Sequence, residues 1–218
     1  MSGVSSSTPR PDEPPLLPIG PPRPGEAEPI ERADAARNRA LLLDAAQQLV
    51  REHGVAGLTM DAVAKRAGVG KGTVFRRFGN RTGLMLALLD HSEQKFQAAF
   101  MFGPPPLGPT ANPVERLIAF GRTRLLDVAV EGDLHRAAEE KGRFGGGPYG
   151  LHKAHVVLLL REAGVSGELP LVADSLLSTL SAALVIHQID ILGYTRAQIG
   201  DNWEWLVRRV VSPAAQVE

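Results

Sequence analysis

The side chains best suited to chemistry in this sequence are cations and a hydroxyl gathered in one short segment, GKGTVFRRF, at residues 70–78. Val74 and Phe78 lie four residues apart, a spacing that places both on one face of a helix. The polar members then occupy the remaining surface of that helix; they are Lys71, Thr73, Arg76 and Arg77. Because such groups bind phosphates and base edges through charge and hydrogen bonds, the pattern predicts noncovalent recognition of a polyanion.

The charge distribution along the chain supports this interpretation. The 218 residues include 24 basic and 24 acidic groups, so the formal net charge is zero. Residues 32–82 nevertheless carry ten basic and four acidic groups, a net charge of +6, whereas residues 1–31 and 83–218 each carry −3. A basic block between acidic flanks indicates one segment that meets a polyanion.

The residue inventory excludes several other classes of chemistry. The chain has no cysteine, which excludes disulfides, thiolate nucleophiles and cysteine-ligated metal sites. It also lacks a nucleophile–base–orienter set, a paired-carboxylate motif and a phosphate-binding loop. His152 and His155 form one pair of potential metal ligands without a third group. We therefore expect no enzymatic activity, no cofactor and no metal.

The sequence also bears on the cellular compartment. No run of apolar residues approaches the roughly 18 that a membrane-spanning helix needs. The N-terminus lacks the basic region followed by an apolar stretch that marks a secretory signal. We therefore expect a cytoplasmic protein with no membrane partner.

Proline and glycine divide the chain into a tail and a series of helices. Residues 1–31 hold nine of the 17 prolines and are predicted to be a disordered tail. Apolar spacings of three and four residues, without strand alternation, predict an all-α protein. The predicted organisation is a three-helix head at 32–82 and a larger helical body at 83–212. Helix 81–102 is expected to lead from the head into the body. The other helices of the body are expected at 114–131, 134–141, 148–163, 169–192 and 195–211.

The head has the layout of a helix-turn-helix, with helices 60–67 and 70–78 joined by a tight turn at Gly68. The segment Thr59–Phe78, TMDAVAKRAGVGKGTVFRRF, closely resembles the helix-turn-helix signature of the tetracycline-repressor (TetR) family, and the resemblance covers about residues 37–89. It implies that the head binds double-stranded DNA. It also implies that the body binds a small-molecule effector and forms a homodimer.

The resemblance further implies which residues contact DNA. They are Thr59, Lys71, Gly72, Thr73, Phe75, Arg76, Arg77 and Arg81. The hydroxyl of Thr59 would meet a phosphate, and the bare backbone at Gly72 would let the helix approach DNA closely. Solvated surface charge is the alternative interpretation for the cations.

Three positions depart from the family pattern. Gly70 replaces the usual serine, Phe75 the usual tyrosine and Arg81 the frequent lysine. Phe75 therefore lacks the hydroxyl that touches a phosphate in the family, whereas Arg81 can still bind one. Beside the turn, Val69 is expected to be a core residue.

Candidates for effector contacts are polar side chains within apolar helices of the body, together with apolar neighbours. They are Phe120, Arg124, His155, Leu159 and His187. Each histidine is alternatively a core or interface residue. Helix 169–192 is apolar nearly all round and needs cover on more than one side, and helix 195–211 adds an apolar face. A two-fold homodimer through these two helices is therefore predicted, and an ordinary monomer core is the alternative.

The mechanism that the resemblance implies is a two-state switch. An unliganded dimer would bind a palindromic operator and repress transcription. An effector would then tilt helix 81–102 and move the heads off the two half-sites. The alternative is an architectural or nucleoid protein without an effector, and an enclosed pocket in the body would distinguish the two. Either function places the protein on the nucleoid.

Overall fold

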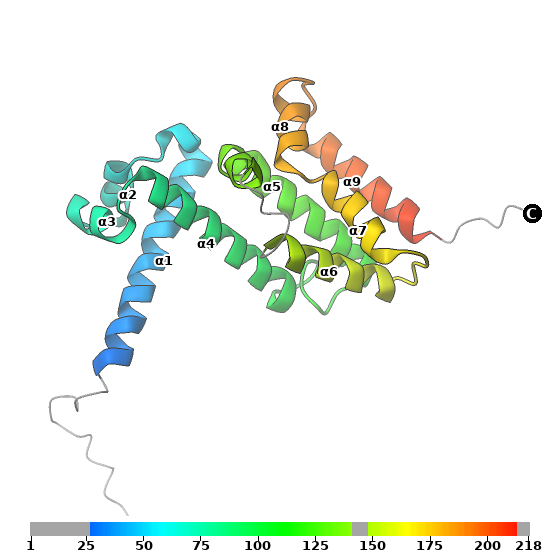
Figure 1. The fold of residues 1–218 in the computed structure, drawn as a ribbon, viewed down its shortest axis with the longest axis horizontal. Coiled ribbons are helices and arrows are strands. Elements are labelled where there is room, and N and C mark those ends of the chain that lie inside the picture. Colours follow the sequence, from blue (N-terminus) through cyan, green and yellow to red (C-terminus); the bar gives the residue numbers. More distant parts are fainter. Residues whose placement is uncertain (1–26, 141–147, 213–218) are drawn as a thin grey trace, which may run out of the picture. The chain divides into compact units, whose positions relative to one another are not determined.

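The computed structural model describes residues 27–140 and 148–212, and it shows helices and turns without a strand in these two stretches (Figure 1). The all-α prediction is therefore confirmed. The chain divides into two compact units, residues 1–37 and 38–218. Helix α1 (Ala27–His53) spans this division and begins ahead of the expected start at Arg32, with Pro29 in its first turn, where proline is tolerated. The remainder of the predicted tail, residues 1–26, lies outside the described residues.

A first hydrophobic cluster, here called the head cluster, organises the helix-turn-helix. Apolar side chains of α1 pack with those of α2 (Met60–Ala67), α3 (Lys71–Phe78) and the first half of α4 (Arg81–Phe102). The 3-10 turn at Val55–Gly57 leads into Leu58, which is fully buried in the same cluster. Its largest members are Leu42, Leu49, Met60, Phe78, Leu84 and Leu88.

Local sequence explains the sharp turn between α2 and α3. The Oγ1 of Thr59 accepts a hydrogen bond from the Ala62 N–H at 3.1 Å and so caps the start of α2. Gly68 ends α2 with φ 67° and ψ 30°, the left-handed conformation that glycine adopts without a Cβ penalty. Gly70 caps α3 without a side-chain bond, as its substitution for serine predicts.

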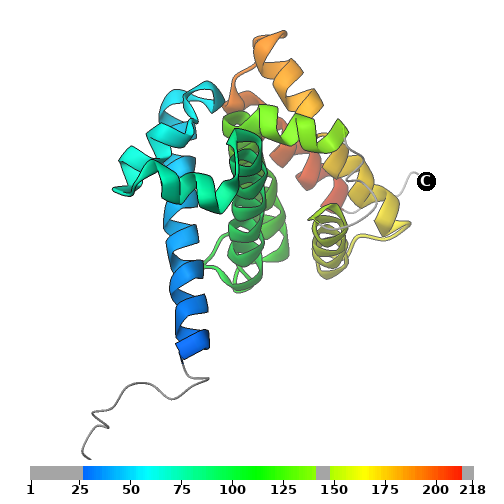
Figure 2. The same cartoon turned by 60° about the vertical axis from the view of Figure 1, so that its left-hand side comes forward.

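A second hydrophobic cluster, here called the body cluster, holds the larger part of the chain. It joins the second half of α4 to α5 (Pro113–Glu140), α6 (Pro148–Glu162), α7 (Leu169–Ser178), α8 (Ala182–Asp190) and α9 (Arg196–Val211). Helix α4 therefore contributes to both clusters, and Figure 1 and Figure 2 show it extending from α2 and α3 to α5 and α6. It also contacts α3, so it links the body cluster directly to the helix-turn-helix.

Helix α5 corrects the prediction of two helices at 114–131 and 134–141, because the chain continues as one helix from Pro113 to Glu140. Gly132 does not end the helix. A Cβ at this position would lie 2.9 Å from Cδ1 of Ile186, so the glycine permits the close approach of α8. One glycine within a helix costs about 1 kcal/mol relative to alanine, which the surrounding helix can absorb.

The predicted helix at 169–192 is also corrected, because the structure breaks it into α7 and α8 (Figure 2). At the break, the hydroxyl of Ser178 donates to the Ser175 carbonyl at 2.7 Å and that of Thr179 to the Leu176 carbonyl at 2.7 Å. Such side-chain bonds compete with the helical backbone pattern. The chain resumes at Ser181, which caps α8 in an extended conformation.

The same segment bears on the membrane expectation. By length and composition, residues Leu169–Asp190 would suffice to cross a membrane, and 33% of the stretch is buried. The sequence contains no unbroken apolar run here, because polar residues interrupt the stretch. Its two helices contain ten and nine residues, whereas a spanning helix needs about 20.

Candidate functional site

The outer face of α3 presents the polar residues that the sequence places there. Lys71, Arg76 and Arg77 are exposed, Thr73 is half-buried, and Val74 and Phe78 are buried beneath them. The predicted division into an inner and an outer face is therefore confirmed. Gly72 is exposed, and a Cβ built on it meets no atom within 4 Å, so the helix backbone is accessible at this point.

The cations of α3 differ in their surroundings. The Nζ of Lys71 lies 2.7 Å from Oδ1 of Asp61 on α2 and 5.6 Å from the centroid of the Phe75 ring. Arg76 and Arg77 have no ion-pair partner among the residues that the structure describes. The charges of Arg76 and Arg77 are therefore more available to an external anion. Lys71 could bind such an anion only by breaking its ion pair with Asp61 or by contacting both at once.

Arg81 has a structural role that the sequence pattern did not reveal. Its Nε donates to the Leu58 carbonyl at 2.8 Å and its Nη2 to the Val55 carbonyl at 2.7 Å. The side chain thus ties the first turn of α4 to the connection before α2. A phosphate contact by its other N–H groups stays a prediction. The phosphate contact of Thr59 also stays one: its Oγ1 accepts from Ala62, which leaves the hydroxyl hydrogen to donate.

The expectation for Val69 is wrong, because its side chain is 37% exposed. The turn is closed by the backbone alone: the N–H groups of Gly68 and Val69 donate to the carbonyls of Lys65 and Ala64 at 3.3 and 3.0 Å. With these bonds made, the turn needs no apolar side chain to hold it.

The structure brings together four of the five residues predicted to contact an effector. Phe120 and Leu159 are fully buried in the body cluster, and the ring of His155 stacks on that of Phe100 with centroids 4.3 Å apart. Arg124 is half-buried on the same helix as Phe120. His187 does not join them, because it is exposed on α8. Among its apolar neighbours on α8, Val185 is buried, whereas Leu184 is 39% exposed.

A buried acid–histidine pair was missed by the sequence analysis. Oε1 of Glu93 on α4 lies 2.8 Å from Nε2 of His152 on α6, and it accepts a second bond from Gln97 at 2.7 Å. Burial raises the pKa of Glu93, but the hydrogen bond and charge of His152, with further help from Gln97 and Arg124, outweigh it and lower that pKa below its usual range. His152 is thus held by a carboxylate through its Nε2.

Arg116 on α5 is a second residue that the sequence did not single out. Its side chain is 8% exposed, and its Nη1 lies 3.5 Å from Oε2 of Glu162. Neither Nε of Arg116 nor Nε2 of His155 has a hydrogen-bond partner. Burial, followed by the charges of Arg116 and His152, lowers the pKa of His155 to about 4, so its imidazole is neutral at pH 7. Only tertiary packing brings these two residues near each other.

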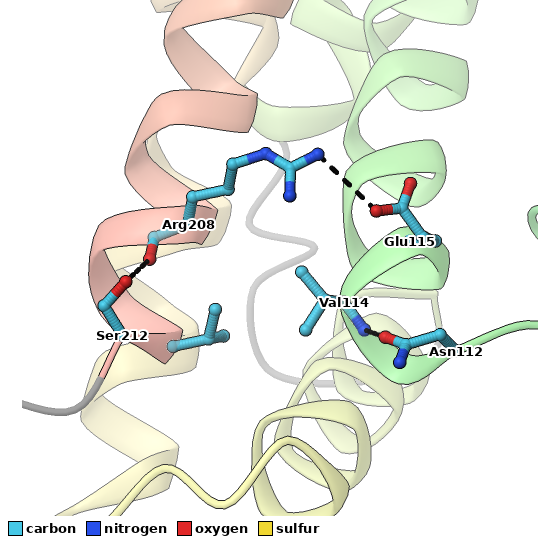
Figure 3. A pocket seen from close by; sticks show the side chains of 6 residues that line it. Asn112, Val114, Glu115, Arg208 and Ser212 are labelled. Atoms are coloured by element: carbon cyan, nitrogen blue, oxygen red, sulfur yellow. Dashed lines mark hydrogen bonds and ion pairs between the residues drawn. The ribbon is translucent and has the colours of Figure 1, made fainter.

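An open hollow of about 500 Å³ lies between the start of α5 and the end of α9 (Figure 3). Arg208 faces Glu115 across it at 3.5 Å and also pairs with Glu204 at 2.8 Å. None of the five predicted effector contacts lines it; the lining residues are Asn112, Val114, Glu115, Arg208, Val211 and Ser212. Its charges are already paired, and its surface is open to solvent, so it lacks the apolar enclosure typical of effector sites.

Comparison with known proteins places the head in a family. Residues 42–88 match the model of the bacterial regulatory proteins of the tetR family. The HTH-type transcriptional repressor LfrR of Mycolicibacterium smegmatis is 35% identical over 89 residues, which are 41% of this chain and 46% of LfrR. An HTH-type transcriptional regulator of Staphylococcus aureus is 32% identical over 69 residues, 32% of this chain and 37% of that protein. The chain therefore aligns with less than half the length of these curated relatives.

Solved structures resemble a larger part of the chain. A TetR transcriptional regulator from Streptomyces coelicolor covers 81% of this chain and 99% of its own, with a TM-score of 0.56 and 23% identity. A structure described as a putative TetR-family regulator from a Rhodococcus species covers 81% and 100%, with a TM-score of 0.55 and 18% identity. At these identities the likeness establishes a shared fold.

Proposed function

We propose that this chain, whose residues 42–88 match the model of the bacterial regulatory proteins of the tetR family, is a dimeric transcriptional repressor released from a palindromic operator by a small-molecule effector. The observation that carries the DNA-binding part is the exposed basic face of α3, held on a buried apolar face. Such a helix fits a major groove, where Arg and Lys reach phosphates and guanine edges. The printed name of LfrR, a repressor, supports repression as the direction of control. A location in the cytoplasm, on the nucleoid, follows from this function.

Exposed apolar side chains near the end of the body support a homodimer. Leu184 on α8 is 39% exposed and Trp205 on α9 is 55% exposed, and the connection between the two helices adds Ile191, Leu192 and Tyr194. Large apolar side chains exposed together in two neighbouring helices and their connection are unfavourable in water and favour a protein contact. A two-fold axis through it would place two copies of α3 on one face, as a palindrome requires.

Packing around α4 supports effector control. The same helix buries Leu84 and Leu88 in the head cluster and Phe96 and Phe100 in the body cluster. A ligand that changes the packing of the second pair would therefore shift the first. An effector needs to favour the non-binding arrangement by only a few kcal/mol to release DNA. The architectural alternative lacks such an effector and would bind DNA without regard to small molecules.

The DNA-binding face is tested with two double variants, each of which removes two exposed arginines from a different part of the chain. The double variant Arg76→Ala, Arg77→Ala is compared with the control Arg161→Ala, Arg196→Ala, whose residues are exposed on α6 and α9. Binding to a duplex DNA of random sequence is measured by fluorescence anisotropy at several salt concentrations. We expect the first variant to bind more weakly and to lose roughly one unit of salt slope for each phosphate contact removed. Equal behaviour of both variants would contradict the assignment of α3.

A further inference from the structure

The body cluster contains a column of side chains drawn from three helices. Phe96 and Phe100 of α4 pack against Phe120 of α5, with ring centroids 5.0 and 5.6 Å from it. His152 and His155 of α6 close the column from the third side, at 5.5 and 5.6 Å from the same ring. The centre of the column is therefore aromatic, and polar groups lie toward its ends.

The two ends of the column differ in how well their polar groups are satisfied. At one end, the Glu93 carboxylate is paired with His152 and Gln97. At the other, His155 and Arg116 each keep a buried nitrogen without a hydrogen-bond partner. Buried donors and acceptors are nearly always paired, so a group that both of these nitrogens could contact is the simplest complement.

The charges at the second end favour an anion as that group. The Arg116 guanidinium is buried, and the nearby Glu162 carboxylate is half exposed to solvent and 3.5 Å away, at the long end of the hydrogen-bond range. A buried cation with so little compensation is unfavourable. Arg116 also stands in the first turn of α5, where the helix dipole adds to the positive potential. A carboxylate could accept from Arg116 Nε and from the His155 ring together.

The surroundings of His155 are apolar. His155 lies against the Phe100 ring, and Leu159 stands one turn further along α6, fully buried. A small hydrated anion would gain nothing from such walls, whereas an aliphatic or aromatic tail would bury its surface there. The site therefore calls for a molecule with one acidic end and an apolar remainder.

We propose that the effector of this protein is an apolar carboxylic acid, with its carboxylate between Arg116 and His155 and its tail against Phe100 and Phe120. The inference rests on the proposed function, because it names the chemical class of the effector. Phe100 belongs to α4, so the tail would act directly on the helix that joins the two clusters. Arg116 and His155 would then select for the acid, and the phenylalanines would transmit its presence.

Matched acids and amides test the proposal. The melting temperature of the full chain is measured with octanoate, phenylacetate, their primary amides and acetate, at equal concentrations. We expect at least one apolar acid to raise the melting temperature while its amide and acetate do not. A lack of response to both apolar acids, or an equal response to an acid and its amide, would overturn the inference.

Variants locate the binding site. Arg116→Met should weaken acid binding about tenfold or more, as loss of a charge-assisted bond predicts. His155→Phe keeps the ring against Phe100, removes Nε2, and should weaken binding less. Arg122→Met is the matched control, because Arg122 lies on the same helix but pairs with Asp201 at 2.7 Å and Glu204 at 2.8 Å. Each melting temperature is compared with that of the same variant without ligand. Undiminished acid binding by both Arg116→Met and His155→Phe would overturn the inference.

Measurement of DNA release distinguishes a failure of this inference from a failure of the proposed function. A duplex enriched from a random library serves as the operator, and the acid that stabilises the protein is added to the complex. Release by that acid supports both proposals. Binding of the acid without release contradicts the effector role while leaving the acid site. Specific operator binding by a protein that binds neither apolar acid overturns the inference and leaves the regulator.

Discussion

At the scale of single residues, the structure separates cations by what they already contact. Arg77 is exposed and has no ion-pair partner within the described part of the chain, whereas Arg81 donates to two backbone carbonyls. From sequence the two are equivalent, because both are arginines beside the recognition segment. The role of Arg81 depends on the position of Leu58, which comes from tertiary structure. The same applies to Arg116 and His155, which no spacing in the sequence connects.

The substitution Arg81→Met should therefore destabilise the head. Two hydrogen bonds from a charged group are lost, and we expect the free energy of unfolding to fall by about 1–2 kcal/mol. Arg77→Met, the matched control, should leave that free energy unchanged within about 0.5 kcal/mol while weakening DNA binding. Urea denaturation of both variants provides the comparison. Equal stability of the two would show that the carbonyl contacts of Arg81 contribute nothing.

His155 should make the stability of the protein depend on pH. Its pKa is about 4 in the folded chain and about 6.5 when unfolded, so at intermediate pH the unfolded state binds the additional proton. The stabilisation is fully present above pH 6.5 and is lost as the pH falls toward 4, by at most about 3 kcal/mol. Chemical denaturation between pH 7 and 4.5 should show this decline in the wild type and a flatter profile in His155→Phe. A variant profile as steep as that of the wild type would exclude His155 as the source.

At the scale of elements, glycines that look like helix breaks prove to be sites of close approach. The absence of a side chain at Gly132 lets Ile186 pack closely against α5, and its absence at Gly121 does the same for the indole of Trp203. The sequence correctly predicted the helices of the head, because their caps and turns are local. It could not predict that α5 continues through Gly132, because the reason for this glycine is the approach of Ile186, a residue distant in sequence. It also did not predict the break within residues 169–192, where the hydroxyl of Thr179 donates to the Leu176 carbonyl. Local signals thus define the head better than the body.

The contact between α5 and α9 gives a prediction at this scale. A Cβ at Gly121 would lie 2.0 Å from Cε2 of Trp203, whose Nε1 also donates to the Leu117 carbonyl at 3.1 Å. Gly121→Ala should therefore displace the indole and destabilise the body by about 3 kcal/mol or more. Gly150→Ala, in a helix position with no atom within 4 Å, should be neutral or stabilising. Thermal unfolding measures both, and a fully stable Gly121→Ala would refute this packing.

At the scale of the whole molecule, the account depends on two copies of the chain. Leu184 on α8 and Trp205 on α9 stay 39% and 55% exposed, and a palindromic operator needs two heads. The sequence indicated this surface through the apolar character of 169–192, although it expected one helix there. It also singled out Phe120, His155 and Leu159, but not the packing of Phe120 with Phe96, Phe100 and His152 that forms the buried column between α4, α5 and α6.

Self-association should be sensitive to charge on α8. Leu184→Arg places a cation in the proposed interface and should shift the chain from dimer to monomer in analytical ultracentrifugation. Leu158→Arg is the control, since Leu158 is exposed to a similar degree, 42% against 39%, but lies on α6. The control should remain dimeric. A dimeric Leu184→Arg or a monomeric wild type would contradict the proposed interface.

Sequence-specific DNA binding is tested by selection of duplex DNA from a random library with the purified full chain, at near-physiological salt, followed by sequencing. We expect enrichment of one palindrome whose half-sites are separated by about one helical turn or a multiple of it. We also expect loss of that enrichment in Arg76→Ala, Arg77→Ala. Binding without any enriched sequence, fading with added salt, would contradict a specific regulator and favour an architectural DNA-binding protein.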